Sequence, residues 1–310
     1  MVQKGRAMDK GRNTNRFSFK LSRRLRRRLL QIAVIAGGVA IIIGIIAIVN
    51  FALNSDGFRD RNATRNSSDD TIAGEEEEPE LIKDIKYLWY YDEAYKERYI
   101  SFAAARPGLS HDKICWMVLC DLDQEPYVYA SEVANPNDIL VLTSKHFYLP
   151  DGYVPTDLIT LGETQMRKEA GEAMNEMTTA AWTEGHTLWS QSGYRSNDLQ
   201  TELYNGYLER EGQAAADATS ARPGHSEHQT GLVTDLNTIT DDFGTSPEGI
   251  WVAENCWKYG YIVRYTSENT DVTLFKPEPW HMRYIGKEAA KKMHDEGIVS
   301  FEEYWAKYVR

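Results

Sequence analysis

Two short segments of the chain combine histidines and carboxylates in a pattern that suits a metal site. The first is SEHQTGLVTD at 226–235, and the second is EPWH at 278–281. A catalytic zinc ion takes three protein ligands and keeps its fourth position for a water molecule, whose pKa it lowers to about 7. We therefore expect Zn2+ to be bound by His228, Asp235 and His281. Glu278 is then the expected general base, which takes the proton of that water.

The spacing of these residues places demands on the backbone. His228 and Asp235 are seven residues apart, which would put them on opposite faces of a regular strand, so the chain must bend between them. Gly231 is the expected bend because glycine adopts conformations that other residues avoid. Pro279 disfavours helical geometry at the residue before it, so the second segment is expected at a strand end or in a loop. His225 stays open as an alternative ligand to His228.

Other local patterns predict the elements around these residues. Helical spacing predicts helices over 165–185 and 197–211, and Ser196 is the expected cap of the second. Residues 139–142 are apolar and predict a short buried strand. Ser300, followed three residues later by a glutamate, predicts the start of a final helix.

An apolar segment near the N-terminus predicts a membrane anchor. Residues 29–53, LLQIAVIAGGVAIIIGIIAIVNFAL, contain no charge, and about 20 apolar residues cross a bilayer as one helix. Residues 1–28 contain many lysines and arginines but a single acid, Asp9, so this basic tail is expected to stay in the cytoplasm. The alternative, a cleaved signal peptide, normally has a shorter apolar run of about 7 to 15 residues. We expect a single-pass protein of the cell membrane.

The part of the chain beyond the anchor is acidic. The whole chain has a formal net charge of -11 although its first residues are basic. Residues 54–80 are rich in Asn, Ser, Asp and Glu, which predicts a disordered acidic stalk. We expect 81–136 to be an N-terminal extension and 137–310 to be the domain that carries the metal site. Basic clusters beside a membrane span commonly set topology and contact anionic lipid, so nucleic acid is not expected as a partner.

Three cysteines allow at most one disulfide bond within the chain. The segment ICWMVLC at 114–120 is apolar and predicts an extended strand. Such a strand would hold Cys115 and Cys120 about 16 Å apart, too far for a disulfide bridge. Two alternatives remain open. Cys256 forms a disulfide bond with Cys115 or Cys120, or all three cysteines are buried thiols.

Three segments make the sequence similar to a known family. RPGHSEHQTG at 222–231, EPWHMRY at 278–284 and SGYRS at 192–196 resemble the VanY-like D-alanyl-D-alanine carboxypeptidases of peptidase family M15B. The resemblance implies an α+β fold with an antiparallel sheet flanked by helices, of the hedgehog/DD-peptidase-like zinc peptidase type. It also implies that the substrate is a peptidoglycan stem peptide, which loses its terminal D-alanine. Leu274 stands where the family usually has glycine.

The resemblance also implies which residues bind the substrate. A carboxypeptidase must recognise a free terminal carboxylate, and the planar guanidinium of Arg195 can bind a carboxylate or polarise the scissile carbonyl. The same arginine occupies the corresponding family position. Gln200 and Ser226 match family positions that help to hold the terminal D-alanine.

Other activities remain open at this point. The same fold includes L,D-carboxypeptidases and D,D-dipeptidases, and a related domain could keep zinc as a non-catalytic module that binds wall peptides. Glu278 favours an enzyme, because a binding module does not need a base beside its metal.

Overall fold

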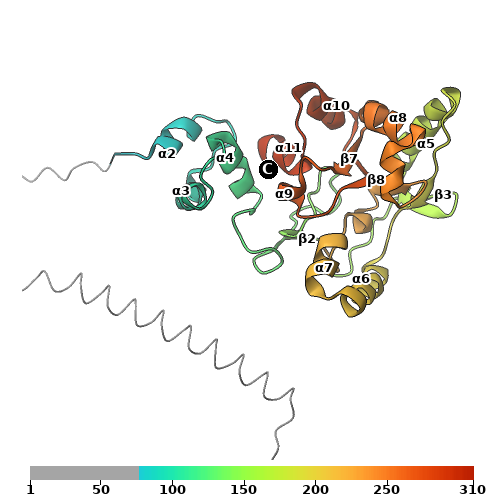
Figure 1. The fold of residues 1–310 in the computed structure, drawn as a ribbon, viewed down its shortest axis with the longest axis horizontal. Coiled ribbons are helices and arrows are strands. Elements are labelled where there is room, and N and C mark those ends of the chain that lie inside the picture. The colour runs from blue at the N-terminus through green and yellow to red at the C-terminus, as the bar shows by residue number, and fades with distance from the viewer. Residues whose placement is uncertain (1–76) are drawn as a thin grey trace, which may run out of the picture. The chain divides into compact units, whose positions relative to one another are not determined.

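The computed structural model describes residues 77–310 (Figure 1). These residues belong to one compact unit. The predicted basic tail, the apolar segment at 29–53 and most of the predicted stalk lie outside the described range. Within that range, no helix is long and apolar enough to cross a bilayer.

A four-stranded antiparallel sheet lies at the centre of this unit, with strand order β5-β6-β8-β7. Its strands are β5 (Ser190–Ser192), β6 (Val233–Leu236), β7 (Tyr261–Tyr265) and β8 (Glu278–Tyr284). Two smaller sheets accompany it, a parallel pair and an antiparallel hairpin. They are formed by β1 (Ser131–Glu132) with β2 (Phe147–Tyr148), and β3 (Leu158–Leu161) with β4 (Thr164–Arg167). The predicted mixed helix and sheet fold is confirmed.

The two faces of the central sheet have different roles. On β8, Met282 and Tyr284 belong to an apolar core that helix α5 (Lys168–Thr183) shares. Because side chains alternate along a strand, His281 and Arg283 lie on the opposite face. One face of the sheet is therefore packed against α5, and the other is left for polar chemistry.

A second apolar core joins the N-terminal extension to the end of the chain. Its helices are α2 (Glu80–Ile85), α3 (Lys96–Ala105), α4 (His111–Leu119), α10 (Lys287–Glu296) and α11 (Phe301–Tyr308). In Figure 1, α4 lies beside α11, and the Cys120 thiol at the end of α4 donates to the Glu302 carbonyl over 3.2 Å. The extension is thus packed onto the last helix of the chain.

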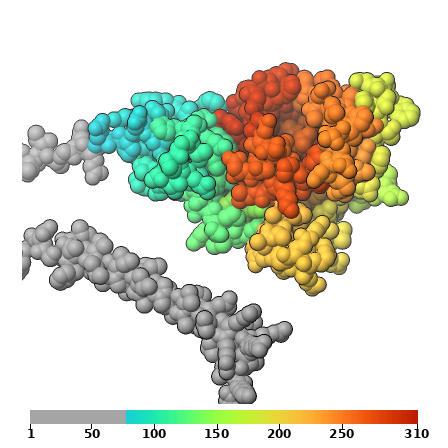
Figure 2. Space-filling view, viewed as in Figure 1, coloured from blue at the N-terminus to red at the C-terminus, as the bar shows by residue number. Residues whose placement is uncertain are grey.

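Helices α6 (Asn197–Glu211) and α7 (Gln213–Thr219) project together from the lower edge in the view of Figure 2. As expected, Ser196 caps α6, because its hydroxyl accepts a hydrogen bond from the Leu199 amide over 3.2 Å. Ser300 likewise caps α11.

Further helices connect these parts of the fold. They are α8 (Pro247–Asn255), α9 (Thr270–Thr273) and the 3₁₀ helices η1 (Glu93–Tyr95), η2 (Glu227–Thr230), η3 (Asp241–Thr245) and η4 (Cys256–Tyr259). Helix α9 ends at Leu274, whose φ of 60° lies in the left-handed region. Glycine adopts that conformation without steric cost, which accounts for the glycine usual at this position in the resembling family.

Two local predictions were wrong, and one helix starts later than predicted. Residues 114–120 form most of helix α4 and its end rather than a strand, because Ser110 caps the helix and Ile114 through Leu119 are all buried. A helix buried on all sides has the same apolar pattern as a buried strand. No strand occurs at 139–142. The helix predicted over 165–185 is confirmed as α5, but it begins only at Lys168, after β4.

The structure also decides between the two alternatives for the cysteines. The structure shows Cys115, Cys120 and Cys256 as free, buried thiols. Burial raises the pKa of Cys115 and Cys256 to about 12, so both stay protonated at neutral pH.

Candidate metal centre

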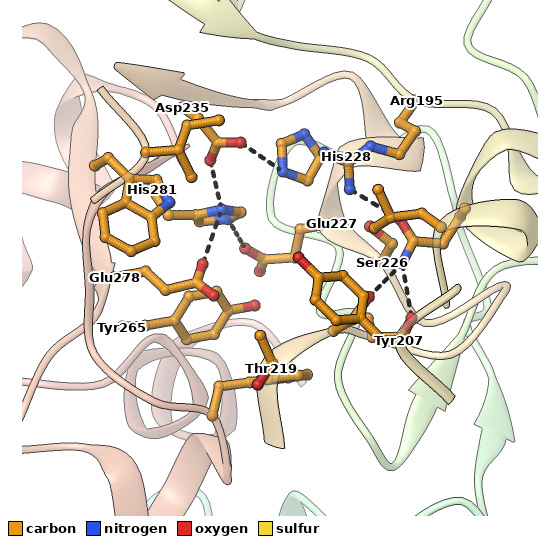
Figure 3. A pocket seen from close by; sticks show the side chains of 17 residues that line it. Arg195, Tyr207, Thr219, Ser226, Glu227, His228, Asp235, Tyr265, Glu278 and His281 are labelled. Atoms are coloured by element: carbon orange, nitrogen blue, oxygen red, sulfur yellow. Dashed lines mark hydrogen bonds and ion pairs between the residues drawn. The ribbon is translucent and has the colours of Figure 1, made fainter. Parts of the chain in front are cut away.

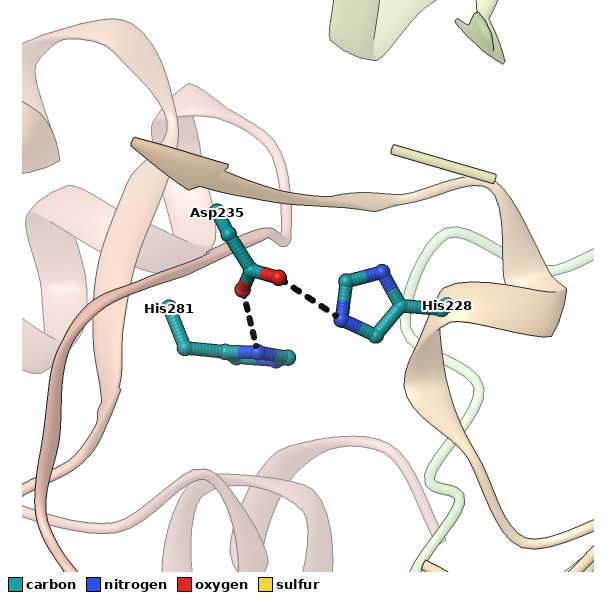
Figure 4. Close-up of side chains that lie close together, drawn as sticks. All are labelled: His228, Asp235 and His281. Atoms are coloured by element: carbon teal, nitrogen blue, oxygen red, sulfur yellow. Dashed lines mark hydrogen bonds and ion pairs between the residues drawn. The ribbon is translucent and has the colours of Figure 1, made fainter. Parts of the chain in front are cut away.

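The register of the central sheet brings two of the expected ligands together. Asp235 on β6 is the direct cross-strand partner of His281 on β8. Their side chains share the polar face of the sheet, and Asp235 Oδ1 lies 3.1 Å from His281 Nδ1 (Figure 4). Opposed residues on antiparallel strands are close neighbours, so the strand pairing by itself positions this pair.

The third expected ligand comes from the turn before β6. His228 lies in η2, which ends at Gly231 with a left-handed φ of 69°. This is the bend expected at Gly231, and it turns the chain so that His228 Nε2 lies 3.4 Å from Asp235 Oδ2. One ligand atom from each of His228, Asp235 and His281 lies within 4.8 Å of the others. All three residues are buried.

The chemistry of this donor set fits zinc. His228 bonds the Gly193 carbonyl through Nδ1 over 2.7 Å, which leaves Nε2 facing the centre. His281 has Nδ1 toward the centre, and its Nε2 lies 3.3 Å from a Glu227 carboxylate oxygen. Each ring therefore has an acceptor behind it, as metal-binding histidines usually do. Two imidazole nitrogens and one carboxylate oxygen are a common ligand set of a catalytic zinc ion.

The charges of the centre are arranged for a cation. Burial opposes the charge of Asp235, but His228, His281 and Arg195 outweigh it and lower its pKa to about 2. Burial lowers the pKa of His228 to about 4, so its ring is neutral at pH 7. For His281, burial favours the neutral ring, yet the hydrogen bonds to Asp235 and Glu227 raise its pKa to about 9. A cation at the centre must therefore replace a proton on His281.

Glu278 lies beside these three residues but is not part of the expected ligand set. It begins β8, and its Oε2 lies 3.6 Å from His281 Nδ1. Burial raises its pKa to about 7, the charges of Asp235 and Glu227 add to the rise, and His281 and Arg195 oppose it. A carboxyl group with a pKa near neutrality can both accept and return a proton, which is what a general base and acid requires.

A pocket of about 370 Å³ opens over the centre and contains the expected substrate residues (Figure 3). Arg195 Nη1 donates to Gln200 Oε1 over 2.9 Å, and its Nη2 donates to Ser192 Oγ over 3.2 Å. Gln200 is held in turn by the Ala221 carbonyl over 2.7 Å. Ser226 also lines the pocket. Among the described residues Arg195 forms no ion pair, so its charge is available to a ligand.

Some residues of the pocket were not anticipated from the sequence. Glu227 contacts His281, while Tyr207, Thr219 and Tyr265 line the walls (Figure 3). Glu227 precedes His228 in the motif, but only the path of η2 shows that it turns toward His281. His225, the alternative ligand, faces away and contacts the Ser144 carbonyl over 2.7 Å.

Comparisons with known proteins identify a family and relatives that this chain resembles. The family model of VanY, described as D-alanyl-D-alanine carboxypeptidase, matches residues 163–287. YodJ of Bacillus subtilis (strain 168), a protein assigned as a carboxypeptidase, is 38% identical over 191 residues, which cover 56% of this chain and 70% of YodJ. The D-alanyl-D-alanine carboxypeptidase of Enterococcus faecium is 36% identical over 166 residues, 53% of this chain and 50% of that protein.

A solved structure extends the comparison to the fold. The LdcB LD-carboxypeptidase aligns with a TM-score of 0.55 and 38% identity, over 57% of this chain and 90% of that one. The resemblance noted from the three motifs is thereby confirmed. The chain belongs to the VanY family of D-alanyl-D-alanine carboxypeptidases.

Proposed function

We propose that the protein is a membrane-anchored zinc carboxypeptidase that removes the terminal D-alanine from peptidoglycan stem peptides. The observation that carries the proposal is the presence in one pocket of a His-Asp-His group and of Arg195, which forms no ion pair with any residue of the described range 77–310. The first suits a hydrolytic metal, and the second suits the free carboxylate that marks the end of a peptide. Together they select the last peptide bond of a chain.

The residues divide the reaction between them. His228, Asp235 and His281 would hold zinc, which would supply a water molecule of lowered pKa and a Lewis acid for the scissile carbonyl. Glu278 accepts the proton of the attacking water and donates it to the leaving amine. Arg195 binds the terminal carboxylate of the substrate. Gln200 holds the Arg195 guanidinium in place, and Ser226 adds a hydroxyl beside the same end of the pocket.

The location belongs to the proposal as well. The apolar segment at 29–53, preceded by a basic tail, is the feature that supports an anchor with a cytoplasmic N-terminus. An acidic stalk at 54–80 would then carry the catalytic domain outside the membrane, where peptidoglycan is found.

One alternative is favoured by a specific observation. The LdcB structure, at 38% identity, is that of an LD-carboxypeptidase. Such an enzyme would use the same metal, base and arginine and differ in the residue accepted before the terminal D-alanine. A tetrapeptide and a pentapeptide therefore distinguish the two activities.

The other two alternatives have less support. A D,D-dipeptidase must also bind the free ammonium group of its substrate, which needs an uncommitted carboxylate. Of the described pocket carboxylates, Glu227 is held by arginines, Asp235 by two histidines, and Glu278 is needed as the base. A non-catalytic module has no use for a Glu278 whose pKa is raised to about 7.

Mass spectrometry of defined peptides tests the proposal. The protein is incubated with a stem pentapeptide ending in D-Ala-D-Ala and with the tetrapeptide that lacks the last residue. We expect loss of one D-alanine from the pentapeptide, no loss after chelation, and recovery on adding zinc. Glu278→Gln should keep zinc and lose the activity. Cleavage of the tetrapeptide alone would establish the LD-carboxypeptidase, and full activity of Glu278→Gln would refute the assigned base.

A further inference from the structure

We infer that Glu227 is a positioning residue, which fixes His281 in the tautomer that leaves Nδ1 free for the metal. The inference deepens the proposed zinc site and rests on it. It assigns to the residue before His228 a function that the metal-binding motif by itself does not reveal.

The geometry around His281 shows why its tautomer needs to be held. Its Nδ1 faces Asp235 Oδ1 at 3.1 Å, and its Nε2, on the other side of Cε1, faces Glu227 Oε2 at 3.3 Å; Figure 3 draws both contacts. A neutral imidazole carries one hydrogen, on either nitrogen. A hydrogen on Nδ1 would point at the metal position and block it. A carboxylate behind Nε2 stabilises the hydrogen there and leaves the Nδ1 lone pair for the metal.

Glu227 is itself held so that only one of its oxygens is available. Its Oε1 accepts from Arg264 Nε over 2.9 Å and from Arg283 Nη1 over 3.2 Å. Oε2 is left to face His281. Although burial opposes the charge of Glu227, the two arginines hold its pKa well below the usual range. Paired with two guanidinium groups, the side chain is a carboxylate that can only accept hydrogen bonds.

Arg264 connects the Glu227 carboxylate to α11, the last helix of the described residues. Arg264 also donates through Nη1 to Glu302 of α11 over 3.0 Å. Glu227, Arg264, Arg283 and Glu302 are each at most 2% exposed. Buried charges of this kind are stable only when all are paired, so the four side chains form one closed network behind the metal centre.

The tautomer of His228 is also set by an acceptor, but by a different one. Its Nδ1 bonds the Gly193 carbonyl over 2.7 Å, which directs Nε2 to the centre. A backbone carbonyl can only accept, just as Glu227 can only accept. Each histidine thus has an acceptor that sets its tautomer, and the acceptor of His281 is the one that a point mutation can change.

Glu227→Gln tests the inference with almost no change in shape. Because Arg264 and Arg283 require an oxygen, the new amide must turn its NH2 group to His281 Nε2, which favours the hydrogen on Nδ1. We expect the zinc dissociation constant of the full chain in detergent to rise about 10- to 100-fold, the size typical of losing such a partner. Competition with a chelating dye measures it. The matched control is Glu302→Gln, which removes a charge from the same network without touching His281 and should leave zinc affinity unchanged.

A second measurement separates positioning from structural support. Urea unfolding of the zinc-free variants reports stability alone, and a merely structural role would lower it in both variants while leaving both zinc affinities like wild type. Nitrogen-15 spectra of zinc-loaded wild type should place the His281 hydrogen on Nε2, a test that needs no variant. Wild-type zinc affinity in Glu227→Gln, or a hydrogen on Nδ1, would overturn the inference alone. Absence of zinc binding by wild type would overturn the zinc site and, with it, the inference.

Discussion

Asp235 and His281 face each other across neighbouring antiparallel strands, with Asp235 Oδ1 3.1 Å from His281 Nδ1. Two of the three proposed metal ligands are therefore set by the register of β6 and β8. A slip of one residue in that register would move one of them to the face packed against α5. The third ligand, His228, depends on the turn at Gly231 instead.

Replacement of Asp235 tests the ligand set. Asp235→Asn keeps the size of the side chain but removes the negative charge, so we expect zinc affinity to fall by more than the about 10- to 100-fold typical of residues behind the ligands. Zinc content after dialysis measures the loss. Asp241→Asn, an exposed position in η3, is the control and should retain zinc. Equal zinc content in both variants would remove Asp235 from the site.

Replacement of Arg195 tests recognition of the terminal carboxylate. Lysine keeps the charge but not the planar fork, so Arg195→Lys should lose about 1.5 to 3 kcal/mol of binding, or about 10- to 150-fold in kcat/KM on a stem peptide. Arg106→Lys changes an exposed arginine in the same way and should have no effect.

A peptide amide provides the second control for Arg195. It has no terminal carboxylate, so wild type and Arg195→Lys should cleave it at similarly low rates. A variant that loses as much activity on the amide as on the free acid would show that Arg195 acts elsewhere in the reaction.

Replacement of Gly231 tests the turn that positions His228. Gly231 has a φ of 69°, and an added Cβ would lie 3.0 Å from Leu158 Cδ2 and 3.1 Å from Arg167 Cγ. Gly231→Ala should cost about 1–3 kcal/mol of unfolding free energy, measured by urea denaturation. Gly206→Ala, inside helix α6, meets only the flexible Arg210 side chain and should be stabilising by about 0.5–1 kcal/mol. If both variants lose the same stability, the strain assigned to Gly231 is wrong.

The buried position of Glu278 predicts a pH dependence of stability in zinc-free protein. Its pKa is raised from 4.5 to about 7, so the folded state binds the proton more tightly than the unfolded state. The contribution of Glu278 to stability is therefore full below 4.5 and is lost as the pH rises through about 7. The glutamine in Glu278→Gln is neutral at every pH, so the variant has no such loss of stability as the pH rises.

Urea unfolding in the presence of chelator, near pH 5 and near pH 8, measures this effect. Comparison with Glu278→Gln cancels the titration of other groups. The variant should exceed wild type in stability at the higher pH by more than at the lower pH. A stability difference that stays constant between the two would contradict a raised pKa at Glu278.

Local signals in the chain were sufficient for several features. The types and spacing of His228, Asp235, Glu278 and His281 indicate a metal hydrolase because few other functions need two histidines, an acid ligand and a spare base. Gly231 and Ser196 act on their immediate neighbours, through backbone conformation and a capping hydrogen bond. Such effects depend on a few adjacent residues, so a linear pattern contains them.

Features that depend on distant parts of the chain were decided only by the tertiary structure. Residues 114–120 form a helix because the extension packs against α11, although their apolar pattern equally suits a strand. Glu227 acts on His281, 54 residues later, and is held by Arg264 of β7 and Arg283 of β8. The sequence by itself determined which chemical groups are available. Burial and strand register determined which of them meet, because contacts between distant segments exist only once the sheet and both cores have formed.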